Sequence, residues 1–103
     1  MFRFTTKNTD EALEVVLEGD LDIEGTEIIE NELTPTITNY KNVKINFEQV
    51  PFVDSSGIGL LLTLVQTLTG QGTNVTILNV SEEVMEVFDI LQIPEILGEG
   101  VFV

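Results

Sequence analysis

The chain has 103 residues, 18 of them Asp or Glu and only 4 Lys or Arg, which gives a formal net charge of −14. Its 43% of hydrophobic residues is too high for a disordered acidic tail, and its length is that of one domain, so we predict a single domain over residues 1–103. The charge argues against binding to nucleic acids or anionic membrane surfaces, because both need clustered Lys and Arg.

The sequence contains no Cys and no His. Disulfides, thiolate nucleophiles, imidazole proton transfer and metal sites built on either side chain are therefore excluded. No signal-peptide pattern begins the sequence, and the longest apolar stretch, Ile58 to Val65, is far shorter than the roughly 20 residues of a membrane span. We expect a cytoplasmic protein without membrane insertion.

The first part of the chain predicts two strands and an interrupted helix. Residues 2–4 and 14–17 have strand character, and the polar turn 7–10 separates them. A helix starting near Thr26 is then predicted by an apolar stripe at helical spacing: Ile29, Leu33, Ile37 and Tyr40. Pro35 falls inside this stripe, and a proline in a helix interior costs about 3 kcal/mol. We therefore expect a bend or two short helical pieces.

The middle of the chain continues with alternating strands and a long helix. In residues 43–47 apolar and polar side chains alternate, which predicts a short strand with one face in the core. A second helix is predicted from about Ser55 to Thr69, closed by the glycine turn 70–72. Residues 75–78 form the next predicted strand.

The last part predicts a third helix and a closing strand. Ser81 is a suitable N-cap, because a side-chain oxygen there accepts a free backbone N–H of the first turn. The predicted buried face of this helix consists of Val84, Val87, Phe88 and Leu91. Pro94 follows its expected end, and residues 101–103 are predicted to be a strand. Strands that alternate with helices indicate an α/β domain.

The second helix is apolar on more than one side. Its core stripe is predicted to be Ile58, Leu61, Leu62, Val65 and Leu68. By this interpretation Leu60 and Leu64 fall on the opposite side, where a surface helix normally carries charge. Such a face belongs either to a fully buried helix or to a docking surface.

A serine pair stands where the second helix begins. Ser55 and Ser56 meet free backbone N–H groups and the positive end of the helix dipole, which favour an added anion. A hydroxyl at this place either caps the helix or is a phosphorylation site.

The segment Asp54 to Leu60 resembles the D-S-[SA]-G-[LI]-G hallmark of STAS domains, the anti-sigma factor antagonists of bacteria. The resemblance extends over about residues 14–97. Further motifs that carry it are Leu17–Asp22, Val43–Phe47, Gly70–Gly72 and Val84–Phe88. It implies a mixed central sheet of four or five strands with three or four helices packed mainly on one face.

The resemblance also implies partner switching in transcription regulation. Carried over, the first serine of the motif is Ser55, which an anti-sigma factor with ATP-dependent serine kinase activity would phosphorylate. The unphosphorylated antagonist binds the anti-sigma factor and thereby frees the sigma factor. A PP2C-type phosphatase restores the unphosphorylated form.

The site implied by the resemblance lies around this serine. Asp20 and Asp22 match acidic positions that contact the kinase. The segment 62–69 lacks the Arg and Lys residues common in the family, which favours an apolar interface centred on Leu60 and Leu64. The full predicted partner-binding set is Asp20, Asp22, Asp54, Ser56, Gly57, Ile58, Leu60 and Leu64. No catalytic residue, metal or cofactor is predicted.

Three alternatives stay open at this point. The carboxylates of Asp20, Asp22 and Asp54 could hold Mg²⁺ as in receiver domains, but the chain has no Lys after Lys44 to stabilise a phosphorylated Asp, so catalysis is not expected. STAS proteins also serve as non-catalytic docking subunits of stressosomes or of lipid-transport ABC complexes. The acidity, finally, serves either to attract a basic partner or only to solvate the surface.

Overall fold

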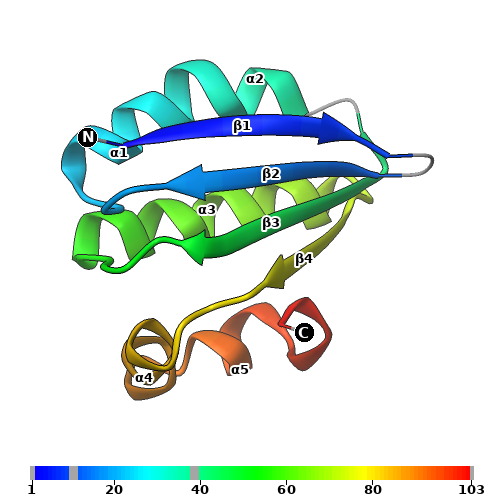
Figure 1. The fold of residues 1–103 in the computed structure, drawn as a ribbon. Coiled ribbons are helices and arrows are strands. Elements are labelled where there is room, and N and C mark those ends of the chain that lie inside the picture. Colours follow the sequence, from blue (N-terminus) through cyan, green and yellow to red (C-terminus); the bar gives the residue numbers. More distant parts are fainter. Residues whose placement is uncertain (1, 10–11, 38–39, 103) are drawn as a thin grey trace.

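The computed structural model of the protein describes residues 2–9, 12–37 and 40–102, and its centre is a four-stranded sheet (Figure 1). The strands are β1 (Arg3–Asn8), β2 (Leu13–Glu18), β3 (Asn42–Gln49) and β4 (Asn74–Leu78). They lie in the order β1-β2-β3-β4; β1 runs antiparallel to β2, and the other neighbouring pairs are parallel. The predicted mixed sheet is confirmed.

Helices cover one face and one edge of this sheet. They are α1 (Ile23–Ile28), the π-helix η1 (Ile29–Leu33), α2 (Thr34–Ile37), α3 (Ser55–Gly70), α4 (Glu82–Ile90), α5 (Ile93–Leu97) and the 3₁₀ helix η2 (Glu99–Val101). Figure 1 shows α1, α2 and α3 on one side of the sheet and α4 with α5 beyond β4. Phe88 of α4 packs edge-on against Phe47 of β3, with ring centroids 6.1 Å apart, and joins α4 to the same core.

The helical segment after β2 begins earlier than predicted and contains a change of helix type. It starts at Ile23 instead of Thr26, because the Asp22 carboxylate caps it. A proline has no N–H to donate to the carbonyl four residues back, so Pro35 needs an irregular turn; the π-helix η1 ends at Leu33, two residues before it. Three of the four predicted stripe residues are buried: Ile29, Leu33 and Ile37. The fourth, Tyr40, lies beyond the end of α2.

The predictions for the end of the chain were partly wrong. The strand predicted for residues 101–103 does not form: Val101 is the last residue of η2, and only an isolated parallel bridge joins Phe102 to Ile77. Val103 and, at the first turn, Asp10 lie outside the described residues. Pro94 stands in the first turn of an additional helix, α5, where its missing N–H costs nothing. Leu91 is 47% exposed because α4 ends before it.

The interpretation of the second helix as apolar on its outer side was wrong for Leu64, which is 4% exposed and belongs to the core. At about 100° per residue, Leu64 lies three residues after Leu61 and four before Leu68, hence on their face. Leu60 and Leu62 flank that face and are partly buried against the core. The exposed side of α3 is uncharged and consists of small or polar residues: Ser55, Ser56, Gly59, Thr63, Gln66, Thr67, Thr69 and Gly70. This side of α3 is therefore not an apolar docking surface.

A buried amide shapes the end of β3. The register between β2 and β3 changes by one residue, since Val16 pairs with Asn46 but Glu18 pairs with Gln49. Asn46 is 7% exposed, and its Oδ1 accepts the Glu48 N–H at 2.8 Å. Because the bulge leaves this N–H without a partner strand carbonyl, the Asn46 side chain satisfies it instead. The bulge bends β3, and the next carbonyl, that of Gln49, accepts the N–H of Gly19 at 3.0 Å.

Candidate functional site

The loops that follow β2 and β3 are joined by backbone hydrogen bonds at one end of the sheet. The Leu21 N–H donates to the Phe52 carbonyl at 2.9 Å, and the Asp54 N–H donates to the Leu21 carbonyl at 3.2 Å. A parallel bridge pairs Leu21 with Val53. These bonds hold Asp20 and Asp22 beside the start of α3, as the sequence analysis expected.

Gly57 allows α3 to approach Leu21, whose backbone hydrogen bonds join the two loops, closely. A Cβ atom added to Gly57 would stand 2.8 Å from the Leu21 Cγ and nearer still to the Leu21 carbonyl oxygen. Real Cβ atoms do not tolerate such a distance to backbone, so the first turn of α3 can lie here only without a side chain at this position. The glycine of the serine motif therefore has a packing role.

The cap of α3 is Asp54 and not a serine. The Asp54 Oδ1 accepts the N–H of Gly57 at 2.9 Å, which satisfies one of the free donors of the first turn. Ser55 and Ser56 are the first two helical residues and are exposed, and within the described part of the chain neither hydroxyl has a hydrogen-bond partner. Of the two sequence-based interpretations of the serine pair, capping is thereby excluded.

Loss of this cap gives a measurable prediction. Asp54→Ala should lower the free energy of unfolding by about 1 kcal/mol, because the Gly57 N–H loses its acceptor. Asp54→Asn is the matched control, since asparagine caps about as well as aspartate and removes only the charge. Chemical denaturation of the three proteins measures the difference. An alanine variant as stable as the native protein would contradict the capping role.

The electrostatics at Ser55 combine one favourable and one unfavourable influence. The N-terminus of the 16-residue helix α3 carries a partial positive charge, which stabilises an anion by about 0.3–1 kcal/mol. Asp54 adjoins the hydroxyl in sequence, and Asp20 is exposed on the neighbouring loop. In the described residues no group of three or more carboxylates is arranged to hold a metal ion.

The comparison with known proteins decides the family. The STAS domain family matches residues 3–102. This chain belongs to the STAS domain family. The anti-sigma-B factor antagonist of Bacillus subtilis is 23% identical to this STAS domain over 91 residues, which are 88% of this chain and 84% of the relative.

Two solved structures are similar in sequence and fold. The anti-sigma factor antagonist SpoIIAA in its unphosphorylated form is 30% identical with a TM-score of 0.68, over 85% of this STAS domain and 83% of SpoIIAA. The Bacillus cell fate determinant SpoIIAA in the phosphorylated form is 28% identical with a TM-score of 0.72, over 98% and 89% of the two chains. In this STAS domain, no helix among the described residues is long and apolar enough to cross a membrane.

The predicted partner-binding residues of this STAS domain fall into two groups. Asp20 and Ser56 are exposed, as is the predicted phosphorylation site Ser55, and Asp22 and Asp54 are half-buried, where each caps a helix. The predicted contacts that lie in the interior are Gly57, Ile58 and Leu64, and Leu60 is half-buried. The buried residues Gly57, Ile58 and Leu64 cannot contact a partner directly. They pack α3 against the rest of the domain.

Two exposed apolar side chains of this STAS domain were missed by the sequence analysis. Ile23 is 64% exposed directly after the Asp22 cap, and Phe52 is 53% exposed three residues before Ser55. Phe52 lies on the loop that is hydrogen-bonded to Leu21, and Ile23 is the first residue of α1, two residues after Leu21. For Phe52 the available signal was an aromatic residue in the short connection between the predicted strand 43–47 and the helix from Ser55, where no strand or helix periodicity accounts for it.

Proposed function

We propose that this STAS domain is an anti-sigma factor antagonist that is switched off by phosphorylation of Ser55. The observation that carries the proposal is the free Ser55 hydroxyl at the start of α3, whose capping role Asp54 has taken over. Relatives named anti-sigma factor antagonists support the partner class, and one of them has been solved in both an unphosphorylated and a phosphorylated form.

The proposed switch transfers one phosphoryl group. The Ser55 Oγ attacks the γ-phosphorus of ATP held by the anti-sigma factor, the bond from the γ-phosphorus to the β–γ bridging oxygen breaks, and ADP leaves. A base on the kinase accepts the hydroxyl proton. A phosphatase reverses the state by transferring the phosphoryl group to water. Ser55 is thus a group on which partners act, and this protein supplies no catalyst.

The added phosphate changes binding more than folding. It brings about −1.5 to −2 charges at neutral pH. Within the protein the charge meets the favourable end of α3 and lies at an exposed position. In a complex, the same charge loses its hydration and faces a partner surface that had accommodated a small neutral hydroxyl. The phosphate would also lie beside the carboxylates of Asp20 and Asp54. The fold should therefore survive the modification while the complex is lost.

Gly59 supports a close contact on this side of α3. A mid-helix glycine costs roughly 1 kcal/mol relative to alanine, and a Cβ at this exposed position would meet nothing within 4 Å. No packing within the described protein explains the glycine. A partner surface that approaches the backbone of α3 beside Ser55 and Ser56 does explain it.

Gly59→Ala should therefore separate stability from binding. The free energy of unfolding should rise by about 0.5–1 kcal/mol, because alanine is the better helix former and has room. Affinity for the anti-sigma factor should fall about tenfold, since a methyl group stands in the contact. Denaturation and calorimetric titration measure the two effects. If Gly59→Ala raises the free energy of unfolding and leaves the affinity for the anti-sigma factor unchanged, Gly59 does not lie in the interface.

Intact mass spectrometry tests the proposed function. The serine-kinase anti-sigma factors encoded in the same genome are incubated one by one with ATP and with native protein, Ser55→Ala or Ser56→Ala. The proposal expects one phosphoryl group on the native protein and on Ser56→Ala and none on Ser55→Ala. If no kinase phosphorylates or binds the native protein, the proposal fails, and a docking subunit of another complex becomes the better explanation.

A further inference from the structure

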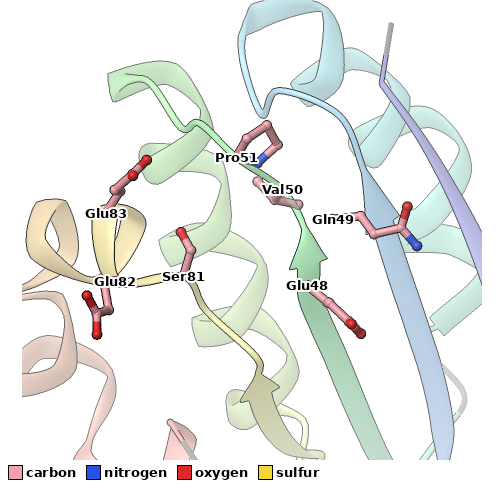
Figure 2. A pocket seen from close by; sticks show the side chains of 7 residues that line it. All are labelled: Glu48, Gln49, Val50, Pro51, Ser81, Glu82 and Glu83. Atoms are coloured by element: carbon pink, nitrogen blue, oxygen red, sulfur yellow. The ribbon is translucent and has the colours of Figure 1, made fainter.

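A groove runs between the end of β3 and the first turns of α4. One part is a hollow of about 700 Å³ between residues 48–51 and 81–83, shown in Figure 2. A second part of about 180 Å³ lies between residues 51–53 and α4. Both parts share Pro51 and Glu83 as lining residues. We call this continuous depression the α4 groove.

The two ends of the α4 groove differ in chemistry. The smaller part has an apolar lining of Pro51, Phe52, Val53, Val84 and Val87. Phe52 is 53% exposed, although burial of an aromatic side chain is favourable. In the larger part Figure 2 shows Glu48 on β3 and Glu82 and Glu83 on α4, with Ser81 between the two elements. None of the four basic residues lines either part.

The groove adjoins the phosphorylation site. Val53 and Phe52, which line its apolar part, directly precede the Asp54 cap of α3. The N-termini of α3 and α4 lie at the same end of the sheet in Figure 1. A partner that covers Ser55 therefore needs to extend only over Phe52 to reach the groove.

We propose that the α4 groove binds a segment of the anti-sigma factor that carries an apolar side chain beside a Lys or Arg. The apolar side chain fills the part next to Phe52, and the cationic group lies in the larger part beside Glu83, which lines both parts. This inference rests on the proposed function, because it assigns a second contact to the same partner. The three glutamates of the α4 groove form no ion pair within the described residues, so they favour a basic segment by charge complementarity.

A second copy of this chain fits the groove poorly. Each copy carries a net charge of −14, so two copies repel each other. Three of the four basic residues, Arg3, Lys7 and Lys44, lie on the strands β1 and β3, and Arg3 already pairs with Glu18 at 3.3 Å. The occupant is therefore expected to be a different, basic protein.

Two variants with matched controls test the groove. Phe52→Ala removes the apolar contact, and Ile90→Ala removes an 80% exposed apolar side chain of α4 outside the groove. The double change Glu82→Gln/Glu83→Gln removes groove charges, and Glu86→Gln/Asp89→Asn removes two exposed charges of α4 that do not line it. Each protein is titrated, at low and high salt, with the anti-sigma factor that binds the native protein.

The groove proposal expects Phe52→Ala to weaken binding at least tenfold and Ile90→Ala to change it less than twofold. The glutamine pair should weaken binding several-fold at low salt and flatten its salt dependence, which its control leaves intact. If the native protein binds the anti-sigma factor and the groove variants bind it equally well, the groove proposal is disproved and the proposed function remains. Failure of the native protein to bind any anti-sigma factor would overturn both. Thermal melting identifies any variant that loses binding by unfolding.

Discussion

Phosphorylation of Ser55 is expected to weaken binding to the anti-sigma factor at least 100-fold while the protein stays folded. A 100-fold loss corresponds to about 2.7 kcal/mol, which is within the cost of placing an unpaired charge in a desolvated interface. The helix dipole and the neighbouring carboxylates act in opposite directions on the phosphate of the free protein. Because each contributes about 1 kcal/mol or less, the melting temperature should shift by no more than a few degrees.

Three substitutions isolate this effect. Ser55→Ala should keep binding within a few-fold of native, because in the free protein the hydroxyl has no partner among the described residues. Ser55→Asp should reduce affinity in the direction of the phosphate, with one charge in place of two. Ser56→Asp tests whether any added charge at this helix end suffices. Calorimetric titration and thermal melting of each protein supply both readings. Undiminished binding by the phosphorylated protein would rule out the switch.

Of the glycine-to-alanine substitutions in this part of the molecule, Gly57→Ala is expected to lower the free energy of unfolding most. The new Cβ would overlap the Leu21 carbonyl oxygen and lie 2.8 Å from the Leu21 Cγ. The obstacle is backbone, so it cannot rotate away; α3 must shift or the Leu21 loop must separate from Asp54. We expect a loss of about 3 kcal/mol in the free energy of unfolding, the upper part of the range for overpacked sites.

Gly59→Ala is the matched control, because it adds the same methyl group two residues further along α3 into open space. Denaturant unfolding should move the two variants in opposite directions. Amide exchange adds a local reading: in Gly57→Ala the N–H groups of Leu21 and Asp54, which form the joint, should lose protection first. If Gly57→Ala were as stable as Gly59→Ala, the close approach of α3 to Leu21 would be disproved.

The elements with strong local patterns were predictable. Residues 43–47 alternate apolar and polar side chains and lie in β3, and the helix predicted from Ser55 to Thr69 ends only one residue later, at Gly70. Ser81 caps α4 as expected, accepting the Val84 N–H at 3.2 Å. These features depend on a few adjacent residues, whose spacing and hydrogen-bonding groups act regardless of the rest of the chain.

The errors occurred where distant segments decide the outcome. The assignment of Leu64 to the outer side of its helix was an error of a different kind, because its spacing from Leu61 and Leu68 alone places it among the six buried positions of α3. Residues 101–103 have strand composition, yet Val101 ends η2 and only Phe102 forms a single bridge, to Ile77, because α5 brings the chain back beside β4 over a short distance. Whether an apolar residue is core or surface depends on what packs over it.

The sequence by itself determined that this chain is an acidic α/β domain with a serine pair at the start of a helix, since composition and local spacing carry that information. It did not determine which group caps that helix or which apolar residues stay exposed. Tertiary structure decided both. The backbone hydrogen bonds of Leu21 with Phe52 and Asp54 place Asp54 at the first turn of α3, where its carboxylate caps the helix in place of Ser55. The same bonds leave Phe52 at the edge of the α4 groove. Backbone bonds between segments some 30 residues apart set this arrangement, and no local pattern encodes such bonds.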